Sequence, residues 1–318
     1  MQAKAPEQTS APTDDGSIRP VAGDGFVETD GVRTLARRAG AYLDAGYPVH
    51  LAGPAGTGKT TLAFHIAAQR DRPVSIIHGN DALRGSDLAG RQGGYRKSRV
   101  VDNYISSVLK FEESLDVRWT DNRLTLACVE GHTLIYDEFN RTRAEGNNLL
   151  LSILEEGILT VPGVSGGVVR VHPEFRMVLT SNPAEYAGVH RAQDALLDRL
   201  VTIRCGHFDE LTERSIIASA SGVSDAEAKA IAGLVRSLRG PDGQRPRPTV
   251  RAGIAIGRLA ASTGARIDAT DETFRAILWD VLGDDAIVET KGVEQPMSRR
   301  VFEELAAGVC GTLTGEDR

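Results

Sequence analysis

The sequence predicts a doubly wound α/β fold, a parallel sheet with helices on both faces, followed by a separate helical region. Between residues 49 and 204, short apolar segments typical of strands alternate with segments of helical periodicity. A glycine-rich segment of the phosphate-loop type follows the first strand directly. Strand signals stop at His207, and only helical segments follow. These observations place a domain boundary near residue 206.

The composition is that of an ordinary soluble globular protein. Of 318 residues, 41% are hydrophobic and 25% are charged. The net charge of −6 predicts no general surface for nucleic acid or for an anionic membrane. Cys128, Cys205 and Cys310 lie far apart, which suits a reducing cytosol and argues against disulfides or a zinc site. No signal peptide and no long apolar run occur, so we expect a cytoplasmic protein without membrane insertion.

The first elements can be assigned in chain order. Residues 1–25 are rich in Pro, Gly, Ser, Thr and Asp and have no sustained apolar period, which predicts a disordered lead. Apolar residues between 32 and 43 recur at helical spacing, which predicts an amphipathic helix that ends near Gly46. Residues 49–52 form the first predicted strand, and residues 62–68 form the helix after the glycine-rich loop.

The loop between this strand and this helix fits the pattern Gly-x-x-x-x-Gly-Lys-Ser/Thr. Its glycines allow backbone N–H groups to converge on a polyphosphate, and the helix directs its positive end at the anion. Lys59 can reach the β- and γ-phosphates, and the Thr60 hydroxyl can complete the shell of a magnesium ion. The alternative is a glycine-rich turn that binds nothing. The predicted nucleotide-binding residues of this segment are Gly53, Pro54, Ala55, Gly56, Thr57, Gly58, Lys59, Thr60 and Thr61.

Four more strands complete the predicted sheet, at residues 73–78, 133–137, 175–181 and 200–204. Helices are predicted at 144–156, with Gly157 as the stop, and at 194–199, and a hairpin at 158–171. The segment between residues 79 and 126 is harder to assign. It combines a glycine-rich stretch, a basic run, an apolar helical segment at 100–111 and an Asp-Asn turn, so we expect insertions with one surface-exposed loop.

The region after the sheet is predicted to be helical, with segments at 211–221, 225–238, 250–262, 271–282 and 298–310. The chain is therefore divided into a disordered lead (1–25), an α/β nucleotide-binding domain (26–206) and a helical lid domain (207–318).

Two acids, Asp137 and Glu138, end the third predicted strand. Ligands gather at the carboxyl ends of parallel strands, and an acid after an apolar strand is costly without a partner. In a nucleotide site that partner is magnesium, which Asp137 can hold directly or through water. Glu138 is then placed to polarise the attacking water as a general base. The alternative is an N-cap pair that opens the next helix.

Two further polar residues occur near strand ends. Asn182 can hold the water in line with the γ-phosphate, although a turn before Pro183 explains an asparagine equally well. Arg199 can reach a phosphate across a subunit interface and stabilise the transition state. An ordinary salt bridge of Arg199 with Asp194 or Asp198 is the alternative, and the residues alone favour it.

Other arginines are weaker candidates. Arg251 opens a helix of the second region and is a candidate lid arginine that senses the γ-phosphate, with Arg245 and Arg247 as rivals. Arg141 and Arg143 can serve the phosphates or a neighbouring subunit, or can simply be solvated at a helix start. Four histidines fit no metal-binding spacing and are assigned to surface or packing roles: His78, His132, His172 and His190.

Longer sequence segments around these residues are shared with a known family. They lie at residues 41–63, 101–110, 136–143, 147–157 and 180–200. Two of them, Asp137-Glu-Phe-Asn-Arg-Thr-Arg and Asn182-Pro-Ala-Glu-Tyr-Ala-Gly-Val-His, are much narrower than the phosphate loop. Over residues 26–205 the chain resembles AAA+ ATPases of the MoxR branch and, within that branch, the GvpN proteins of gas vesicles.

This resemblance implies a core sheet in the order 5-1-4-3-2, a helical lid and a ring, commonly of six subunits. Carried over by position, it implies the Walker A loop at Gly53 to Thr60, the Walker B acids at Asp137 and Glu138, the first sensor at Asn182, the arginine finger at Arg199 and the second sensor at Arg251. The run Arg-Pro-Thr-Val-Arg251 departs from the Pro-Arg pairing usual in MoxR lids.

The resemblance further implies an ATPase needed for gas vesicle assembly. We therefore expect a cytoplasmic, gas-vesicle-associated ATPase that uses ATP and Mg²⁺ and acts as a ring on protein clients of the vesicle shell. Two alternatives stay open. One is a MoxR-type chaperone that activates a metalloenzyme, as the CbbQ/NorQ-like relatives do, and the other is a nucleotide-binding structural component with little turnover. DNA remodelling is disfavoured by the acidic balance.

Overall fold

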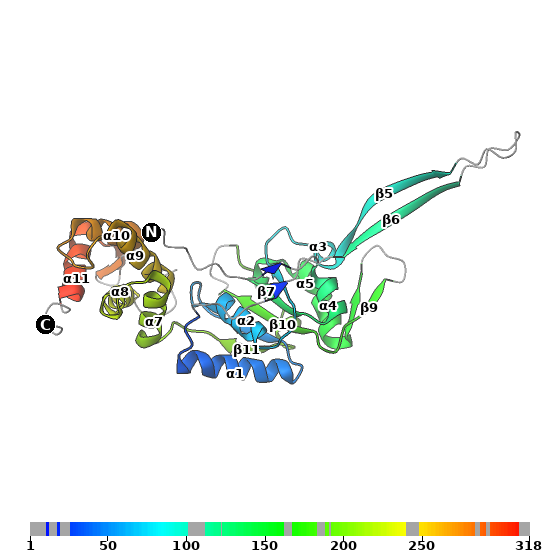
Figure 1. The fold of residues 1–318 in the computed structure, drawn as a ribbon, viewed down its shortest axis with the longest axis horizontal. Coiled ribbons are helices and arrows are strands. Elements are labelled where there is room, and N and C mark those ends of the chain that lie inside the picture. Colours follow the sequence, from blue (N-terminus) through cyan, green and yellow to red (C-terminus); the bar gives the residue numbers. More distant parts are fainter. Residues whose placement is uncertain are drawn as a thin grey trace, which may run out of the picture.

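The computed structural model describes residues 11–12, 18–19, 26–100, 112–121, 123–161, 167–182, 188–190, 192–239, 248–283, 287–290 and 293–311. The described chain forms an α/β core and, beside it, a group of helices, and a long hairpin extends from the far side of the core (Figure 1).

The core contains a seven-stranded sheet in the order β1-β2-β4-β7-β10-β3-β11. Five neighbouring strands are parallel: β4 (Val74–His78), β7 (Thr133–Asp137), β10 (Arg176–Ser181), β3 (Val49–Ala52) and β11 (Val201–Arg204). Numbered along the chain, these strands stand in the order 5-1-4-3-2. The predicted doubly wound sheet and its strand order are confirmed.

Two short strands, β1 (Ala11–Pro12) and β2 (Ile18–Arg19), extend the sheet at the β4 edge. They pair with each other antiparallel, and Ile18 of β2 pairs with Val74 of β4. These four residues form paired strands, whereas the composition predicts a disordered lead over residues 1–25. An edge strand presents unpaired backbone groups, and a short segment can satisfy them without an apolar pattern of its own. The other residues of the predicted lead lie outside the described residues.

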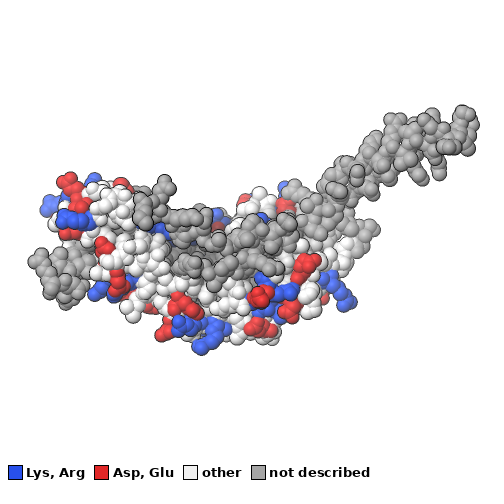
Figure 2. Space-filling view, viewed as in Figure 1, with Lys and Arg blue, Asp and Glu red and all other residues white. Residues whose placement is uncertain are grey.

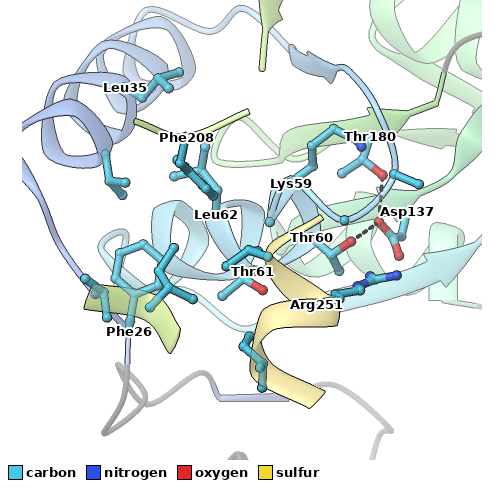
Figure 3. Close-up of a pocket in the computed structure, with 18 of the residues that line it drawn as sticks. Phe26, Leu35, Lys59, Thr60, Thr61, Leu62, Asp137, Thr180, Phe208 and Arg251 are labelled. Atoms are coloured by element: carbon cyan, nitrogen blue, oxygen red, sulfur yellow. Dashed lines mark hydrogen bonds between the residues drawn. The ribbon is translucent and has the colours of Figure 1, made fainter. Parts of the chain in front are cut away.

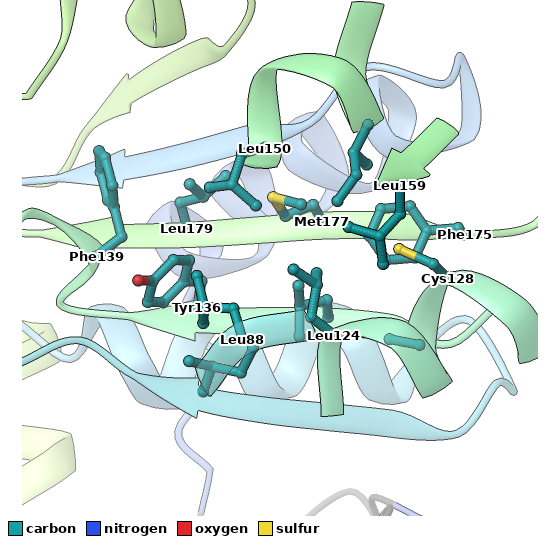
Figure 4. Close-up of a cluster of buried hydrophobic side chains, with 14 of the residues drawn as sticks. Leu88, Leu124, Cys128, Tyr136, Phe139, Leu150, Leu159, Phe175, Met177 and Leu179 are labelled. Atoms are coloured by element: carbon teal, nitrogen blue, oxygen red, sulfur yellow. The ribbon is translucent and has the colours of Figure 1, made fainter. Parts of the chain in front are cut away.

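Helices cover both faces of the sheet, because alternate residues of each buried strand point to opposite faces. One face packs against α1 (Asp30–Asp44) and α2 (Lys59–Ala68), with Ile135 among its buried strand residues. The other face packs against α3 (Gly85–Ala89), α4 (Arg123–Glu130) and α5 (Ala144–Glu156). There the ring of Tyr136 and the side chains of Leu124 and Leu150 lie in one apolar layer (Figure 4).

The ends of these helices follow local chemistry. The Thr29 hydroxyl accepts a hydrogen bond from Val32 N and caps α1. Helix α5 stops at Gly157, which has the left-handed φ of 64° that favours glycine. The stop at Gly157 is therefore as predicted.

Two hairpins leave the core. β8 (Ile158–Thr160) pairs with β9 (Val168–Arg170), as predicted. β5 (Gly90–Val100) pairs antiparallel with β6 (Glu112–Asp121) in the segment where the sequence predicts insertions with one surface-exposed loop. The backbone groups of this stretch are satisfied by pairing over the length of two strands, which the glycine-rich composition did not indicate. The predicted helical segment lies outside the described residues from 101 to 111.

The second region contains α7 (Glu210–Ser221), α8 (Asp225–Ser237), α9 (Val250–Thr263), α10 (Glu272–Leu282) and α11 (Arg299–Gly311). Their apolar faces share a core of their own, which includes Ile231, Ile256 and Phe274. The expectation that strands stop at His207 was wrong, because β12 (Ile287–Thr290) and β13 (Val293–Pro296) form an antiparallel hairpin. Both strands mix polar and apolar residues and lack the continuous apolar run that marks the buried strands of the core.

The described surface carries both signs of charge. In the view of Figure 2, acidic and basic side chains are interspersed over the described face rather than gathered into a field of one sign. Within the described chain, no helix combines the length and the apolar character needed to cross a membrane.

Candidate functional site

A cavity of about 290 Å³ lies where the carboxyl ends of the central strands meet the helical region. Its lining residues are Phe26, Val27, Val32, Leu35, Ala55, Gly56, Gly58, Lys59, Thr60, Thr61, Leu62, Asp137, Glu138, Thr180, Asn182, Phe208, Ile216, Val250, Arg251 and Ile254. The lining divides into a polar end around Lys59, Asp137 and Arg251 and an apolar end around Phe26 and Phe208 (Figure 3). This division suits a ligand with an anionic part and an apolar ring.

The glycines of the phosphate loop are required by space and by conformation. A Cβ atom at Gly53 would lie 1.9 Å from the backbone oxygen of Cys205. A Cβ atom at Gly56 would lie 2.3 Å from Thr249 Oγ1, and both Gly56 and Gly58 have a φ of +74°. The loop is therefore packed closely between β11 and the start of α9, with its backbone turned toward the cavity.

Lys59 is the buried cation of the cavity, with 6% of its surface exposed. Its Nζ donates to the backbone oxygens of Gly53 at 2.8 Å and Pro54 at 2.6 Å, and to Asn182 Oδ1 at 3.0 Å. Burial lowers the pKa of Lys59 to about 8, although the nearby carboxylates of Asp137 and Glu138 oppose this shift. An anion that enters the cavity would therefore meet a largely desolvated amine.

Asp137 lies at the end of β7 and faces the phosphate loop. Its Oδ1 accepts hydrogen bonds from Thr60 Oγ1 at 2.7 Å and from Thr180 Oγ1 at 2.6 Å (Figure 3). Sequence reasoning missed Thr180, whose hydroxyl also accepts a hydrogen bond from Glu138 N at 2.8 Å. Its position near the carboxyl end of the fourth predicted strand, two residues before Asn182, was the available signal.

Glu138 is held by contacts on both carboxylate oxygens. Asn182 Nδ2 donates to Oε1 at 2.9 Å, and Arg141 Nε lies 2.9 Å from Oε2. Glu138 also has a φ of 52°, an uncommon left-handed conformation for a residue other than glycine. No side-chain capping bond is made at this position, and the Asp137 carboxylate faces Thr60 instead. The N-cap alternative for the two acids is therefore not supported.

The two predicted arginines occupy different places. Arg251 opens α9 and lines the cavity, whereas its rivals Arg245 and Arg247 lie outside the described residues. Arg199 does not line the cavity of its own chain. Arg199 donates to Ala195 O at 2.6 Å and pairs with Glu155 Oε2 at 2.8 Å. Glu155 was not one of the partners considered from the sequence.

Of the remaining polar candidates, His78 Nδ1 lies 3.6 Å from Asp137 Oδ2, and three others contact groups that do not line the cavity. Arg143 pairs with Asp81 at 2.9 Å, and His190 lies 2.7 Å from the same carboxylate. His132 lies 3.0 Å from the Ser75 hydroxyl in the core. Over the described ranges, no group of three or more His, Cys, Asp and Glu side chains is arranged to hold a metal ion.

The apolar end of the cavity was not predicted. Phe26 and Leu35 reach it from the segment around α1, and Phe208, Ile216 and Ile254 reach it from the helical region. Each of these residues fits an ordinary apolar position in its own segment. Only the packing of the helical region against the core brings them together, and nothing in the local sequence signals that packing.

A P-loop, an acid at the end of the third core strand, a 5-1-4-3-2 sheet and a helical region over the cavity define a P-loop ATPase of the AAA+ class. The family described as "AAA domain (dynein-related subfamily)" matches residues 48–200. A RuvB mutant structure from Thermotoga maritima has the same fold, with a TM-score of 0.52 and 18% identity over 85% of this chain and 74% of that chain.

The relatives narrow the class to one family. The gas vesicle ATPase GvpN of Ancylobacter aquaticus is 43% identical over 95% of this chain and 91% of its own length. GvpN1 of Halobacterium salinarum is 40% identical over 89% of this chain and 80% of its own length. Protein NorQ of Paracoccus denitrificans is 26% identical over 83% of this chain and 87% of its own length. The chain belongs to the GvpN family of gas vesicle ATPases, within the MoxR group of AAA+ proteins. It is an ATP hydrolase, and proteins of its class typically form oligomeric rings.

Proposed function

We propose that this ATPase hydrolyses magnesium-bound ATP in the cavity between the core and the helical region, and uses the resulting conformational change to drive gas vesicle formation. The observation that carries the proposal is the hydrogen-bonded chain from Lys59 through Asn182 to Glu138, with the Thr60–Asp137 contact beside it. Through Asn182, these hydrogen bonds connect the cation proposed to bind phosphate with an acid that can act as a general base.

The roles follow from the contacts. Lys59 and the positive end of α2 bind the triphosphate. Asn182, which contacts both Lys59 and Glu138, is placed to orient a water molecule at the γ-phosphate, and the Glu138 carboxylate accepts the proton of that water. The Arg141 guanidinium partly neutralises Glu138 in this conformation, so the carboxylate must leave Arg141 before it serves as a base.

The residues present fit a magnesium ion. The Thr60 hydroxyl and an Asp137 carboxylate oxygen are 2.7 Å apart, and both are the hard oxygen donors that Mg²⁺ prefers. These two residues would hold the ion. Bound there, Mg²⁺ would neutralise charge on the triphosphate.

A ring is proposed from the position of Arg199. Because this side chain does not line its own cavity, it serves as an arginine finger only if it reaches the cavity of a neighbouring copy. Arg251 is proposed to sense the γ-phosphate within its own chain, since it lines the cavity at the start of α9. A ring of six is proposed by likeness to the class.

The vesicle role is supported by relatives named gas vesicle ATPases, at 43% and 40% identity over most of this chain. The clients are proposed to be structural or accessory proteins of the shell, and the location the cytoplasm and the vesicle surface. A MoxR-type chaperone of a metalloenzyme is the second candidate, supported by the 26% identity to NorQ. The higher identity and coverage favour the vesicle role.

Phosphate release from ATP tests the chemistry. Lys59→Ala and Glu138→Gln should each lower turnover by about 10²-fold or more, and Glu138→Gln should retain bound nucleotide. Glu130→Gln, an exposed acid at the end of α4, is the matched control and should keep normal turnover. Normal turnover in both site variants would discard this mechanism. Tight binding of ATP by the wild-type chain without phosphate release would instead favour a structural nucleotide-binding component.

Vesicle counts test the role. In a vesicle-forming host that lacks its own GvpN, the wild-type chain should restore vesicle number and length by electron microscopy, and the Glu138→Gln chain should not. Equal restoration by both chains would refute ATP-driven assembly. Failure of an active wild-type chain to restore any vesicles, with activation of a metalloenzyme, would favour the second candidate.

A further inference from the structure

A buried acid with two arginine partners lies in the helical region, and none of the three side chains lines the cavity. Glu213 of α7 has 2% of its side chain exposed. Its Oε1 lies 2.7 Å from Arg239 Nη1, and its Oε2 lies 3.2 Å from Arg236 Nη1. Arg236 belongs to the last turn of α8, and Arg239 lies two residues beyond the end of that helix. The group therefore connects α7 to the end of α8 with a net charge of +1.

Each arginine also holds a backbone oxygen next to the cavity. Arg236 Nη1 donates to Phe208 O at 3.1 Å, and Arg239 Nε donates to Pro248 O at 3.0 Å. These two oxygens belong to two segments that are separate in sequence, the connection from β11 to α7 and the residue before the N-cap of α9. One carboxylate thus fixes two separate segments through two arms.

The Arg236 arm leads to the apolar end of the cavity. The Phe208 ring lines that end, and a Cβ atom at Gly58 would lie 3.4 Å from it. The Phe208 ring and Leu35 lie on the side of the cavity away from Asp137 (Figure 3). A nucleotide with its phosphates at Lys59 would place its base toward this end, so the backbone position of Phe208 affects the fit of the base.

The Arg239 arm leads to the phosphate end. Pro248 directly precedes Thr249, which caps α9 and packs against Gly56 of the phosphate loop. Arg251 follows two residues later and lines the cavity. The hydrogen bond from Arg239 therefore fixes the segment that places Arg251 against the phosphate loop.

Stability alone does not account for this arrangement. Removal of a carboxylate and two guanidinium groups from water is costly, and a well-packed apolar substitute is often as stable or more stable. The surrounding core of the helical region is apolar, and Arg239 Nη2 is buried without a hydrogen-bond partner among the residues that the structure describes. What an apolar substitute cannot supply is directional bonds to two chosen backbone oxygens.

We propose that Glu213, Arg236 and Arg239 form a two-armed positioning network that sets the two ends of the nucleotide site separately. The Arg236 arm sets the Phe208 wall for the base, and the Arg239 arm sets the segment that carries Arg251. The inference rests on the proposed function, because it takes the cavity as the ATP site. None of the three residues is a catalytic residue, since none of them lines the cavity.

The test separates affinity from turnover in two single variants. Arg236→Met should raise the Kd of a fluorescent ADP by about tenfold, the scale of one hydrogen bond to a charged group, with kcat at saturating ATP within about twofold. Arg239→Met should lower kcat by about tenfold or more, with the Kd for ADP within about twofold, because Arg251 meets the γ-phosphate that ADP lacks. Arg300→Met, whose side chain is 88% exposed in α11, is the control and should change neither.

A loss of folding common to Arg236→Met and Arg239→Met would change Kd and kcat together in both variants and would not separate the two effects. Glu213→Gln removes the charge and one of the two acceptor oxygens that hold the arginines, so it should show both defects. Glu210→Gln on the exposed side of α7 should show neither. If Glu213→Gln does not fold, the effect of Arg236→Met on Kd and of Arg239→Met on kcat still tests the network. Equal effects of Arg236→Met and Arg239→Met on both parameters, or no effect of either, would overturn the network. Full turnover by Glu138→Gln, with the effects of Arg236→Met on Kd and of Arg239→Met on kcat unchanged, would instead refute Glu138 as the general base and leave the positioning network standing.

Discussion

Nucleotide binding should take up a proton from solution at alkaline pH, and Lys59 is the reason. Burial lowers the pKa of Lys59 from 10.5 to about 8 in the nucleotide-free protein. Above pH 8 the amine is therefore mostly neutral before the ligand arrives. The negative phosphates favour the charged form, so the pKa of Lys59 should return to its ordinary value or above in the complex.

The size of the effect follows from the shift. At pH 9 roughly one Lys59 in ten is charged in the free protein and nearly all are charged in the complex, an uptake of about 0.9 proton. At pH 7 the free protein is already mostly charged, and the uptake falls to about 0.1 proton. The affinity should therefore decrease by up to about tenfold per pH unit between pH 8 and pH 10.5.

Calorimetry measures this uptake directly. A non-hydrolysable ATP analogue is titrated at pH 7 and at pH 9 in buffers of different ionisation enthalpy, and the slope of observed heat against buffer heat gives the protons taken up. Burial lowers the pKa of His50 to about 4 and raises the pKa of the Cys205 thiol, so neither group contributes. The same uptake at both pH values would refute the assigned state of Lys59 and its contact with phosphate.

Two substitutions extend the test to the loop and to the subunit interface. Gly53→Ala would place a Cβ atom 1.9 Å from a backbone oxygen, so nucleotide binding measured by fluorescence should be lost. The control Gly206→Ala adds a Cβ atom with nothing within 4 Å and should bind nucleotide normally. Normal binding by both variants would show that the close approach of Gly53 to the Cys205 backbone is not needed. Arg199→Ala should lower turnover by about 10³-fold with nucleotide affinity retained, and Arg266→Ala, at 73% exposure, should not. Turnover that is unaffected in a purified ring of Arg199→Ala subunits would remove the arginine finger.

Sequence patterns predicted the elements whose signals are local. The five parallel strands and the helices over residues 144–156 and 250–262 agree with the structure to within a few residues, because buried strands and amphipathic helices have strong periods. Lys59, Asp137 and Asn182 also meet as predicted, because the carboxyl ends of neighbouring parallel strands meet at one edge of the sheet.

The rest depends on contacts between distant segments. The pairing of β5 with β6 joins strands on either side of an eleven-residue interval, 101–111, in a stretch that periodicity did not resolve. Arg199 contacts Glu155, which lies 44 residues earlier, rather than its neighbours in sequence. The place of Phe208 in the cavity depends on how two groups of elements pack. Such contacts are set by tertiary packing, which local propensity does not encode.

The central claim is that one triphosphate lies among Lys59, Asp137 and Asn182. A crystal structure of the Glu138→Gln variant grown with ATP and Mg²⁺ tests it most directly. The account predicts phosphate density along residues 53–60, an ion between Thr60 and Asp137, and the base beside Phe208. Density for the nucleotide at any other place, with this cavity closed by its own side chains, would contradict the account.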